Sequence, residues 1–200
     1  MKKTIFKMTM VLFISVIAFS GCKKGEDDPG ISFRSRTARL AGNWKLSSMD
    51  YTTTNTGNGS TSTAHYTYSG TILSYVYTSN GYTDTQTLMY TNNIEIEKDG
   101  TYNQTIIYDG NNNIETGNWL WVRKSKEQDL KKKEAVLFSS TSKTDSDGTS
   151  TYSGKTNLGG NAMVIKRLAN KEMVFLFDYS HTTSDGKVNN TTGTWTFVQE

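Results

Sequence analysis

The chain has 200 residues, with 22 basic and 19 acidic side chains and 34% hydrophobic residues, which is enough for one domain with a real core. The formal charge of +3 is too small to give a basic overall field, so nucleic acid is not expected as a partner. One cysteine, Cys22, excludes a disulfide framework and a thiolate metal site.

The first 21 residues predict a secretory signal peptide. Three lysines precede an apolar run over residues 8–19, and two small residues follow it. This run is too short for a membrane span, which takes about 20 apolar residues. The sequence Phe19-Ser20-Gly21-Cys22 resembles the lipobox of bacterial lipoproteins, which are cut before the cysteine and acylated on it. We therefore expect lipid attachment at Cys22; a plain secretory signal is the alternative.

Residues 22–34 predict a flexible tether, because they are polar and charged and hold the chain's one proline. The acidic cluster 26–28 is similar to the export signal of Bacteroidota-type lipoproteins. We expect an outer-membrane lipoprotein exposed on the cell surface; facing the periplasm is the alternative. Removal of residues 1–21 takes three lysines away, so the mature chain has 19 basic and 19 acidic residues and a net charge near zero.

Residues 35–200 predict a single all-β domain. Thr, Tyr, Val and Ile favour strands, and Asn, Gly and Asp favour the turns between them. A helical turn is expected at 36–40, and residues 51–63 and 142–160 read as polar loops. About nine or ten short antiparallel strands predict a barrel or a sandwich, because an open sheet would leave exposed edges. Strands are expected at 43–49, 64–78, 83–91, 94–97, 101–108, 115–123, 135–139, 162–168, 172–179 and 192–198.

A Gly-x-Trp pattern occurs three times, ending at Trp44, Trp119 and Trp195. Glycine this close to a tryptophan permits tight packing, as at the bends of small barrels. Strand alternation places a set of large side chains on the inner face, either in the core or lining a ligand site. These candidate residues are Trp44, Ile96, Tyr102, Trp119, Trp121, Phe175, Phe177 and Trp195.

The order of the motifs along the chain resembles that of a known protein family. Gly42-Asn43-Trp44 is similar to the first-strand signature of lipocalin-type barrels, and Asp99-Gly100-Thr101-Tyr102 and Gly117-Asn118-Trp119 follow it. Behind a lipobox, this pattern resembles the lipocalin-like domain lipoproteins of the Bacteroidota type over about residues 36–199. The resemblance implies a lipocalin-like antiparallel barrel of about 8–10 strands on the cell envelope, in a family whose members mostly lack an assigned activity.

The sequence offers little for catalysis. It holds two histidines, too few for a histidine-ligated metal site, and no nucleophile elbow or phosphate-binding loop. The Ser-x-x-Lys match at 140–143 falls at a strand end, and the calcium-loop start at 145–148 lacks its closing glutamate. We expect no enzymatic activity, no cofactor and no metal.

Two functions stay open. The first is an envelope-anchored carrier that binds a small apolar or amphipathic ligand in the barrel, since an eight-stranded barrel can hold one small ligand. The second is a surface module with a filled barrel, binding a glycan or a partner protein through exposed aromatic strands or the basic segment 123–134. The two differ in whether the inward side chains leave a cavity. The sequence does not indicate the oligomeric state.

Overall fold

The computed structural model describes residues 27–29, 34–57, 59–123, 134–151 and 162–200. The expected signal peptide and Cys22 lie outside these residues. The described chain holds one short helix, α2 (Arg36–Leu40), whose N-cap Ser35 accepts a hydrogen bond from the Ala38 N–H at 3.1 Å. The strands are β1 (Gly42–Gly57), β2 (Ser60–Ser69), β3 (Ile72–Ser79), β4 (Tyr82–Ile96), β5 (Thr101–Tyr108), β6 (Asn111–Arg123), β7 (Glu134–Asp145), β8 (Gly148–Thr151), β9 (Met163–Leu168), β10 (Glu172–Thr182) and β11 (Val188–Gln199).

The strands form a closed antiparallel barrel, as the sequence predicts. Their order is β6-β5-β4-β3-β2-β1-β11-β10-β9-β7, and β6 pairs with β7 to close the ring. β8 lies outside the ring as a hairpin partner of β7. Ring closure removes the exposed sheet edges that an open arrangement of these strands would leave.

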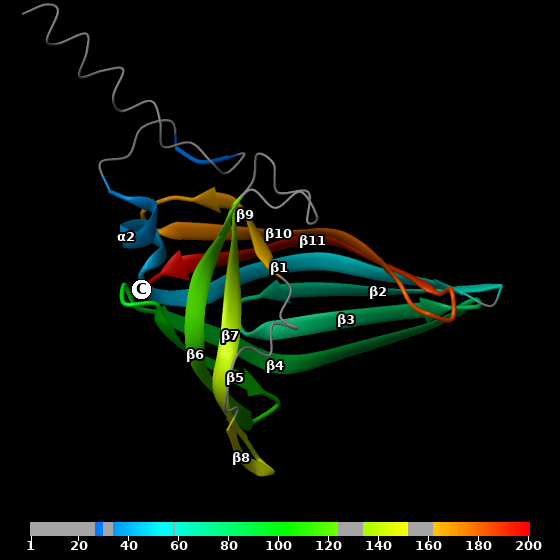
Figure 1. Ribbon diagram of the computed structural model, residues 1–200. Helices are drawn as coiled ribbons and strands as arrows, with labels where there is room; N and C mark the ends of the chain where they lie inside the picture. The colour runs from blue at the N-terminus through cyan, green and yellow to red at the C-terminus, as the bar shows by residue number, and fades with distance from the viewer. Residues whose placement is uncertain (1–26, 30–33, 58, 124–133, 152–161) are drawn as a thin grey trace, which may run out of the picture.

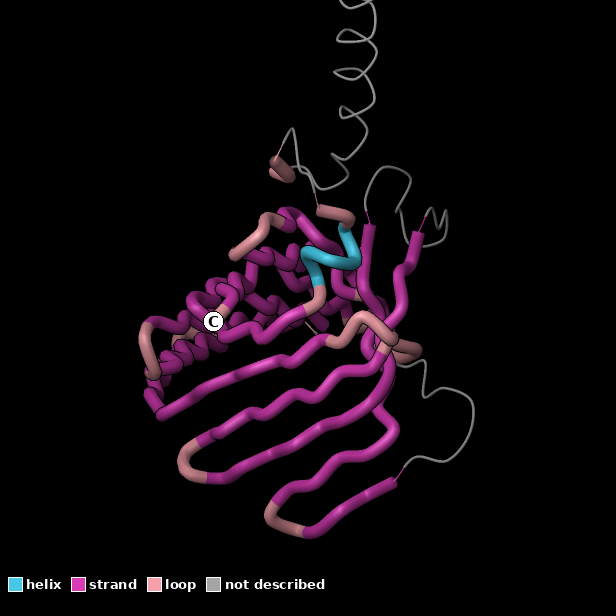
Figure 2. The backbone as a smooth tube through the Cα atoms, turned by 90° about the vertical axis from the view of Figure 1, so that its left-hand side faces the viewer, coloured by secondary structure: helices cyan, strands magenta, loops and turns pink. Residues whose placement is uncertain are grey.

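The two ends of the barrel differ in strand number. At one end β1 pairs directly with β4, through residues 42–45 and 93–96. Further along, the β2–β3 hairpin separates them, because β1 pairs with β2 from Ser48 onward. Eight of the described strands therefore surround the end near α2, which we call the closed end. Toward the opposite, open end β2 and β3 join the sheet between β1 and β4, while β9 extends no further than Met163. In Figure 1 β1, β10 and β11 run away from α2 to the right, whereas β6 and β7 run downward to β8, so these two groups of strands diverge. Figure 2 looks onto α2 in front of the strand ends.

The core lies at the closed end. Trp44 is 1% exposed, and its indole N–H donates to the Leu40 carbonyl at 2.7 Å, so the first turn and the first strand pack as one unit. Phe175 and Phe197 are fully buried, with ring centroids 6.0 Å apart in an edge-to-face arrangement. This part of the barrel is filled by side chains.

The Gly-x-Trp repeats mark close approaches of neighbouring strands. A Cβ at Gly117 would overlap the backbone of Ser139, and one at Gly193 would overlap the backbone of Asp50 and Tyr51. At Gly42 the side chain of Gln199 occupies the space instead. The interpretation of these glycines as packing sites is confirmed: a neighbouring strand or one of its side chains approaches each of them, and at Gly117 the ring of Tyr102 does so as well.

Two expected loops are strands in the structure. Residues 51–57 continue β1 and residues 60–63 begin β2, where a polar loop over 51–63 is expected from the sequence. The prediction is wrong because threonine is a good strand residue and each of these residues has a cross-strand partner. Likewise β7 runs on to Asp145 and turns into β8, so the expected loop at 142–160 begins as a hairpin.

Candidate functional site at the open end

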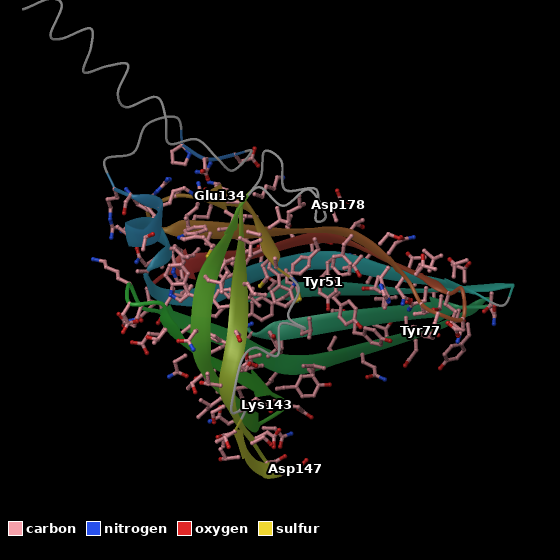
Figure 3. The ribbon with its side chains drawn as sticks, viewed as in Figure 1. Tyr51, Tyr77, Glu134, Lys143, Asp147 and Asp178 are labelled. Carbon is pink, nitrogen blue, oxygen red and sulfur yellow. The ribbon has the colours of Figure 1, made fainter. Side chains whose placement is uncertain are left out.

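The inner face of the long strands changes in character from the closed to the open end. Cross-strand partners on this face form rows, each of which takes one residue from β10, β11, β1, β2, β3 and β4 in that order. The apolar row joins Phe175, Trp195, Met49, Tyr68, Leu73 and Leu88. The tyrosine row joins Phe177, Gly193, Tyr51, Tyr66, Tyr75 and Gln86. The amide row, nearest the rim, joins His181, Asn189, Asn55, Ser62, Ser79 and Tyr82. A further row lies between the tyrosine row and the amide row and joins Tyr179, Thr191, Thr53, Ala64, Tyr77 and Asp84. Figure 3 shows Tyr77 further toward the tip of the β2–β3 hairpin than Tyr51. From the closed end to the rim, the rows exchange hydrophobic surface for hydrogen-bonding groups.

The tyrosine row is built by direct ring contacts. Tyr51 and Tyr66 stack with centroids 4.5 Å apart and planes 6° apart, and Tyr66 meets Tyr75 at 4.9 Å. Tyr51 also lies 6.0 Å from the ring of Phe177, above the gap that Gly193 leaves for want of a side chain. Burial raises the pKa of Tyr51 and of Tyr66, and the neighbouring phenols add to this, so both rings stay neutral at physiological pH.

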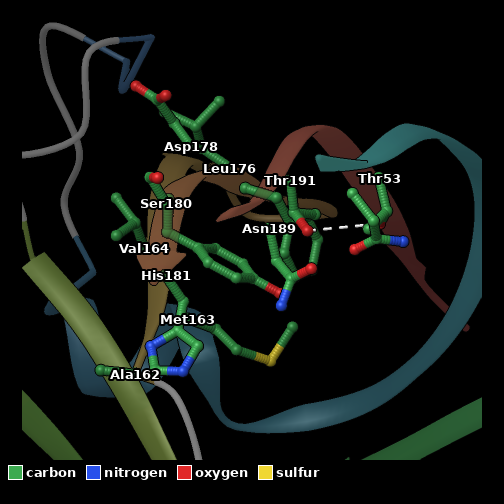
Figure 4. A pocket seen from close by; sticks show the side chains of 13 residues that line it. Thr53, Ala162, Met163, Val164, Leu176, Asp178, Ser180, His181, Asn189 and Thr191 are labelled. Carbon is green, nitrogen blue, oxygen red and sulfur yellow. Dashed lines mark hydrogen bonds between the residues drawn. The ribbon is translucent and has the colours of Figure 1, made fainter. Parts of the chain in front are cut away.

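A pocket of about 810 Å³ lies beside these rows. It opens where β9 ends: the last β9–β10 pair is Val164 with Leu176, and among the described residues the rest of β10 pairs only with β11. Apolar side chains form one part of the wall and amides and hydroxyls the other, as Figure 4 shows. The lining residues are Thr53, Asn55, Ala162, Met163, Val164, Leu176, Phe177, Asp178, Tyr179, Ser180, His181, Asn189 and Thr191.

The pocket has few charges to offer a ligand. Asp178 supplies the one carboxylate in its lining, and no lysine or arginine is among the described lining residues. Thr53 and Thr191 share a hydrogen bond of 3.2 Å across β1 and β11, which orients two hydroxyls at the wall. Such a lining suits a largely neutral molecule with an apolar part and a few hydrogen-bonding groups.

Of the eight candidate residues from the sequence, five are buried in the core and three pack against it. The buried residues are Trp44, Ile96, Tyr102, Trp119 and Phe175; the others are Trp121, Phe177 and Trp195. Phe177 alone among the eight also lines the pocket.

Sequence reasoning missed most of the lining of the pocket. Thr53 and Asn55 fall in the stretch read as a loop, and Asn189 lies outside the strand expected at 192–198. Residues 52–56 are all threonine or asparagine, so no alternation of apolar and polar side chains marks them as a strand. The bulge between Leu46 and Ser48 also interrupts the period of the residues before them.

A second polar group lies on the opposite wall. The Tyr102 hydroxyl donates to Glu115 at 2.5 Å and lies 3.4 Å from the Ser140 hydroxyl. Burial, then the adjacent carboxylate, raises the pKa of Tyr102. Gln104 donates to the buried Asn92 at 2.8 Å. These contacts satisfy polar groups inside the barrel, and no nucleophile–base pair is among them.

The closed end carries a buried charged cluster. Arg36 forms ion pairs with Asp28 and, at 2.5 Å, with Glu134, and its guanidinium lies 5.5 Å from the centroid of the Trp121 ring. Arg39 donates to the carbonyl of Leu168 at 2.5 Å. Asp28 belongs to the expected flexible tether, yet it is 4% exposed. Residues 27–29 thus lie against the barrel, and the expectation of a solvated linker does not describe them.

The described residues offer little for other kinds of site. No group of three or more His, Cys, Asp or Glu side chains is placed to hold a metal within the described ranges. No helix there is long and apolar enough to cross a bilayer. Ser140 and Lys143 lie on β7 and face Gly117 and Glu115 of β6, so the Ser-x-x-Lys match is part of a strand.

No protein-family model matches the sequence, and no curated protein matches it. Among solved structures, the chain is similar to a redesigned β-barrel, mFAP1, bound to DFHBI. The two are 18% identical over 83% of this chain and 100% of that one, with a TM-score of 0.17. A TM-score this low carries no argument, so the barrel assignment comes from the strand pairing of this chain itself.

Proposed function

We propose that this protein is an envelope-anchored lipoprotein whose barrel binds a small apolar or amphipathic ligand without catalysing a reaction. The pocket of about 810 Å³ at the open end is the observation that carries the proposal, because its volume lies within the range of small-molecule sites. Its wall is apolar at Met163 and Phe177 and polar at Asn55 and Asn189, which suits a ligand with an apolar and a polar part.

Anchoring is supported by the sequence. Cys22 follows an apolar segment and small residues, and acylation there would hold the chain on a membrane, most effectively with more than one acyl chain. The outer membrane, with exposure on the cell surface, is the proposed location. Protease treatment of intact cells tests the exposure: digestion of the protein supports it, and protection until the outer membrane is opened indicates a periplasmic orientation.

Two neighbouring asparagines on β11 test ligand binding. Asn189 lines the pocket, whereas Asn190 is exposed and lies on the opposite face of the same strand. Asn189→Trp would fill part of the pocket and is expected to weaken binding more than tenfold. Asn190→Trp adds the same indole outside it and should leave binding unchanged.

The measurement is native mass spectrometry of residues 23–200, followed by titration with whatever ligand copurifies. A copurified mass that both wild type and Asn190→Trp retain, and that Asn189→Trp loses, supports the pocket. Equal retention by both variants would place the ligand elsewhere. A bare polypeptide mass in every case would count against the carrier function.

A surface module that binds a glycan or a partner protein is the second candidate. It is favoured by the filled closed end and by the half-buried tyrosines of the open end. Tyr75→Ala and Tyr77→Ala should abolish glycan or partner binding in that case. Both residues lie outside the lining of the pocket, so a carrier would retain its ligand.

A further inference from the structure

Residues 27–29, which we call the strap, are fixed to β9. The Asp27 N–H donates to the Lys166 carbonyl at 3.0 Å, and the Arg167 guanidinium donates to the Asp27 carbonyl at 2.9 Å. The Leu168 N–H donates to the Asp28 carboxylate at 2.7 Å, and Arg36 holds the same carboxylate from α2. The strap is therefore held through its backbone and its side chains, by β9 and by Arg36 of α2. Figure 1 shows it beside β9.

The strap lies next to the pocket. Val164 and Met163 line the pocket, and Lys166, which receives the strap, is two residues further along β9 than Val164. At about 3.3 Å per strand residue, the strap meets β9 about 7 Å from the pocket wall. The side opening of the pocket and the attachment of the strap therefore share one side of the barrel.

The strap also shortens the connection to Cys22. Five Cα–Cα steps lead from Cys22 to Asp27, and they can span at most about 18 Å. If α2 were the first fixed point, the fourteen Cα–Cα steps from Cys22 to Arg36 could span about 50 Å, as far as the 16-residue strand β1 extends. Any face of the barrel could then reach the membrane. With the strap docked, the wall at Val164 stays within about 25 Å of Cys22.

We infer that the strap turns the β9–β10 side of the barrel toward the bilayer that holds Cys22, and that the ligand is an amphiphile which enters the pocket from that bilayer. This inference rests on the proposed function, both its lipid anchor and its pocket. The barrel's own contacts set the orientation, through the hydrogen bonds of Asp27 and Asp28 to β9.

A longer connection tests the inference without disturbing the fold. Twelve Gly/Ser residues inserted between Gly25 and Glu26 leave the strap and the barrel intact but lengthen the connection from Cys22 to Asp27 from five to seventeen Cα–Cα steps. The same twelve residues added after Glu200 are the matched control. Each lipidated chain is placed on phosphatidylcholine vesicles that contain an NBD-labelled monoacylglycerol and a lipid-bound quencher, and transfer to the protein is followed as the gain in fluorescence.

Effective concentration falls roughly as the −3/2 power of linker length, so the insertion should slow transfer about sixfold, whereas the C-terminal control should transfer like the wild type. Equal transfer by the two chains would overturn the inference.

In a second arm, the same probe is given in buffer to unlipidated chains. Binding there by both chains shows that the pocket works, so a failure in the first arm then belongs to the strap. No binding in buffer, or a chain without acyl mass, would overturn the proposed function instead.

Discussion

The two ends of the barrel use the same strands for different purposes. At the closed end, Phe175, Trp44 and Phe197 are at most 1% exposed and pack as a core. Along the same β10, four residues later, Tyr179 is 44% exposed and lines a pocket. Backbone pairing with β11 continues unbroken over both stretches, so hydrogen bonding does not distinguish them. What differs is whether another layer of side chains covers the inner face.

The comparison indicates how stability and binding are divided. A filled closed end supplies buried apolar surface, at about 25 cal/mol per Å². The open end contributes pairing with less burial, which leaves its side chains available to a ligand. Substitutions at the closed end should therefore act on stability, and substitutions at the open end on binding.

The largest expected effect comes from truncating the core. Phe175→Ala removes a ring that is 0% exposed and contacts Phe197 and Phe138, and it should lower the free energy of unfolding by about 3–5 kcal/mol. Tyr179→Ala, on the same strand and the same face, should change it by no more than about 0.5 kcal/mol. Urea unfolding followed by tryptophan fluorescence measures both. Comparable losses for the two variants would mean that the open end is as tightly packed as the closed end.

A smaller effect is expected at the boundary between the ends. Gly193 has φ of 144°, and a Cβ there would overlap the backbone of Asp50 and Tyr51. Gly186, in the turn before β11, has φ of 80° and open space around it. Gly186→Ala should cost about 1–2 kcal/mol for the positive φ alone. Gly193→Ala should cost about 1–3 kcal/mol more, because the strands must move apart.

The same unfolding measurement separates the two glycines. A Gly193→Ala variant no less stable than Gly186→Ala would show that β1 and β11 can separate at little cost. In that case the tyrosine row would not depend on the gap left by Gly193, and the contact of Tyr51 with Phe177 should survive the substitution.

The closed end was largely legible in the sequence. Large apolar residues at alternate positions of a strand lie on the same face of the sheet. Ile94 and Ile96, before the Asp99-Gly100 turn, are an example. This alternation and the number of short strands were sufficient to predict a barrel or a sandwich with its core among these side chains. These signals come from residues close together in the sequence, so the periodicity of the sequence is enough to predict them.

The open end could not be read in the same way. Thr53, Asn55 and Asn189 are polar on both sides of their strands, so no hydrophobic period marks which face is inward. Their strand structure depends on partners 7 to 138 residues away, such as Ser62 for Asn55 and Thr191 for Thr53. The burial of Asp28 is similarly non-local: a charged residue in a polar stretch becomes buried because Arg36 and β9 receive it.

The smallest predicted effect concerns alkaline pH. The pKa of Tyr51 is raised above the ordinary value of 10.0, mainly by burial in the tyrosine row. The folded state therefore keeps its proton more tightly than the unfolded chain, so this contribution is present in full below pH 10 and is lost as the pH rises through the folded-state pKa. Unfolding free energies measured from pH 8 to 11 should hold steady and then decline above pH 10.

Two variants separate the contribution of Tyr51. Tyr51→Phe cannot ionise, so its curve should decline less steeply than that of the wild type. Tyr82 is 65% exposed near the rim, so Tyr82→Phe should follow the wild type. If Tyr51→Phe left the decline unchanged, the row would be open to water, and the boundary between the packed and the accessible part of the barrel would lie nearer the apolar row.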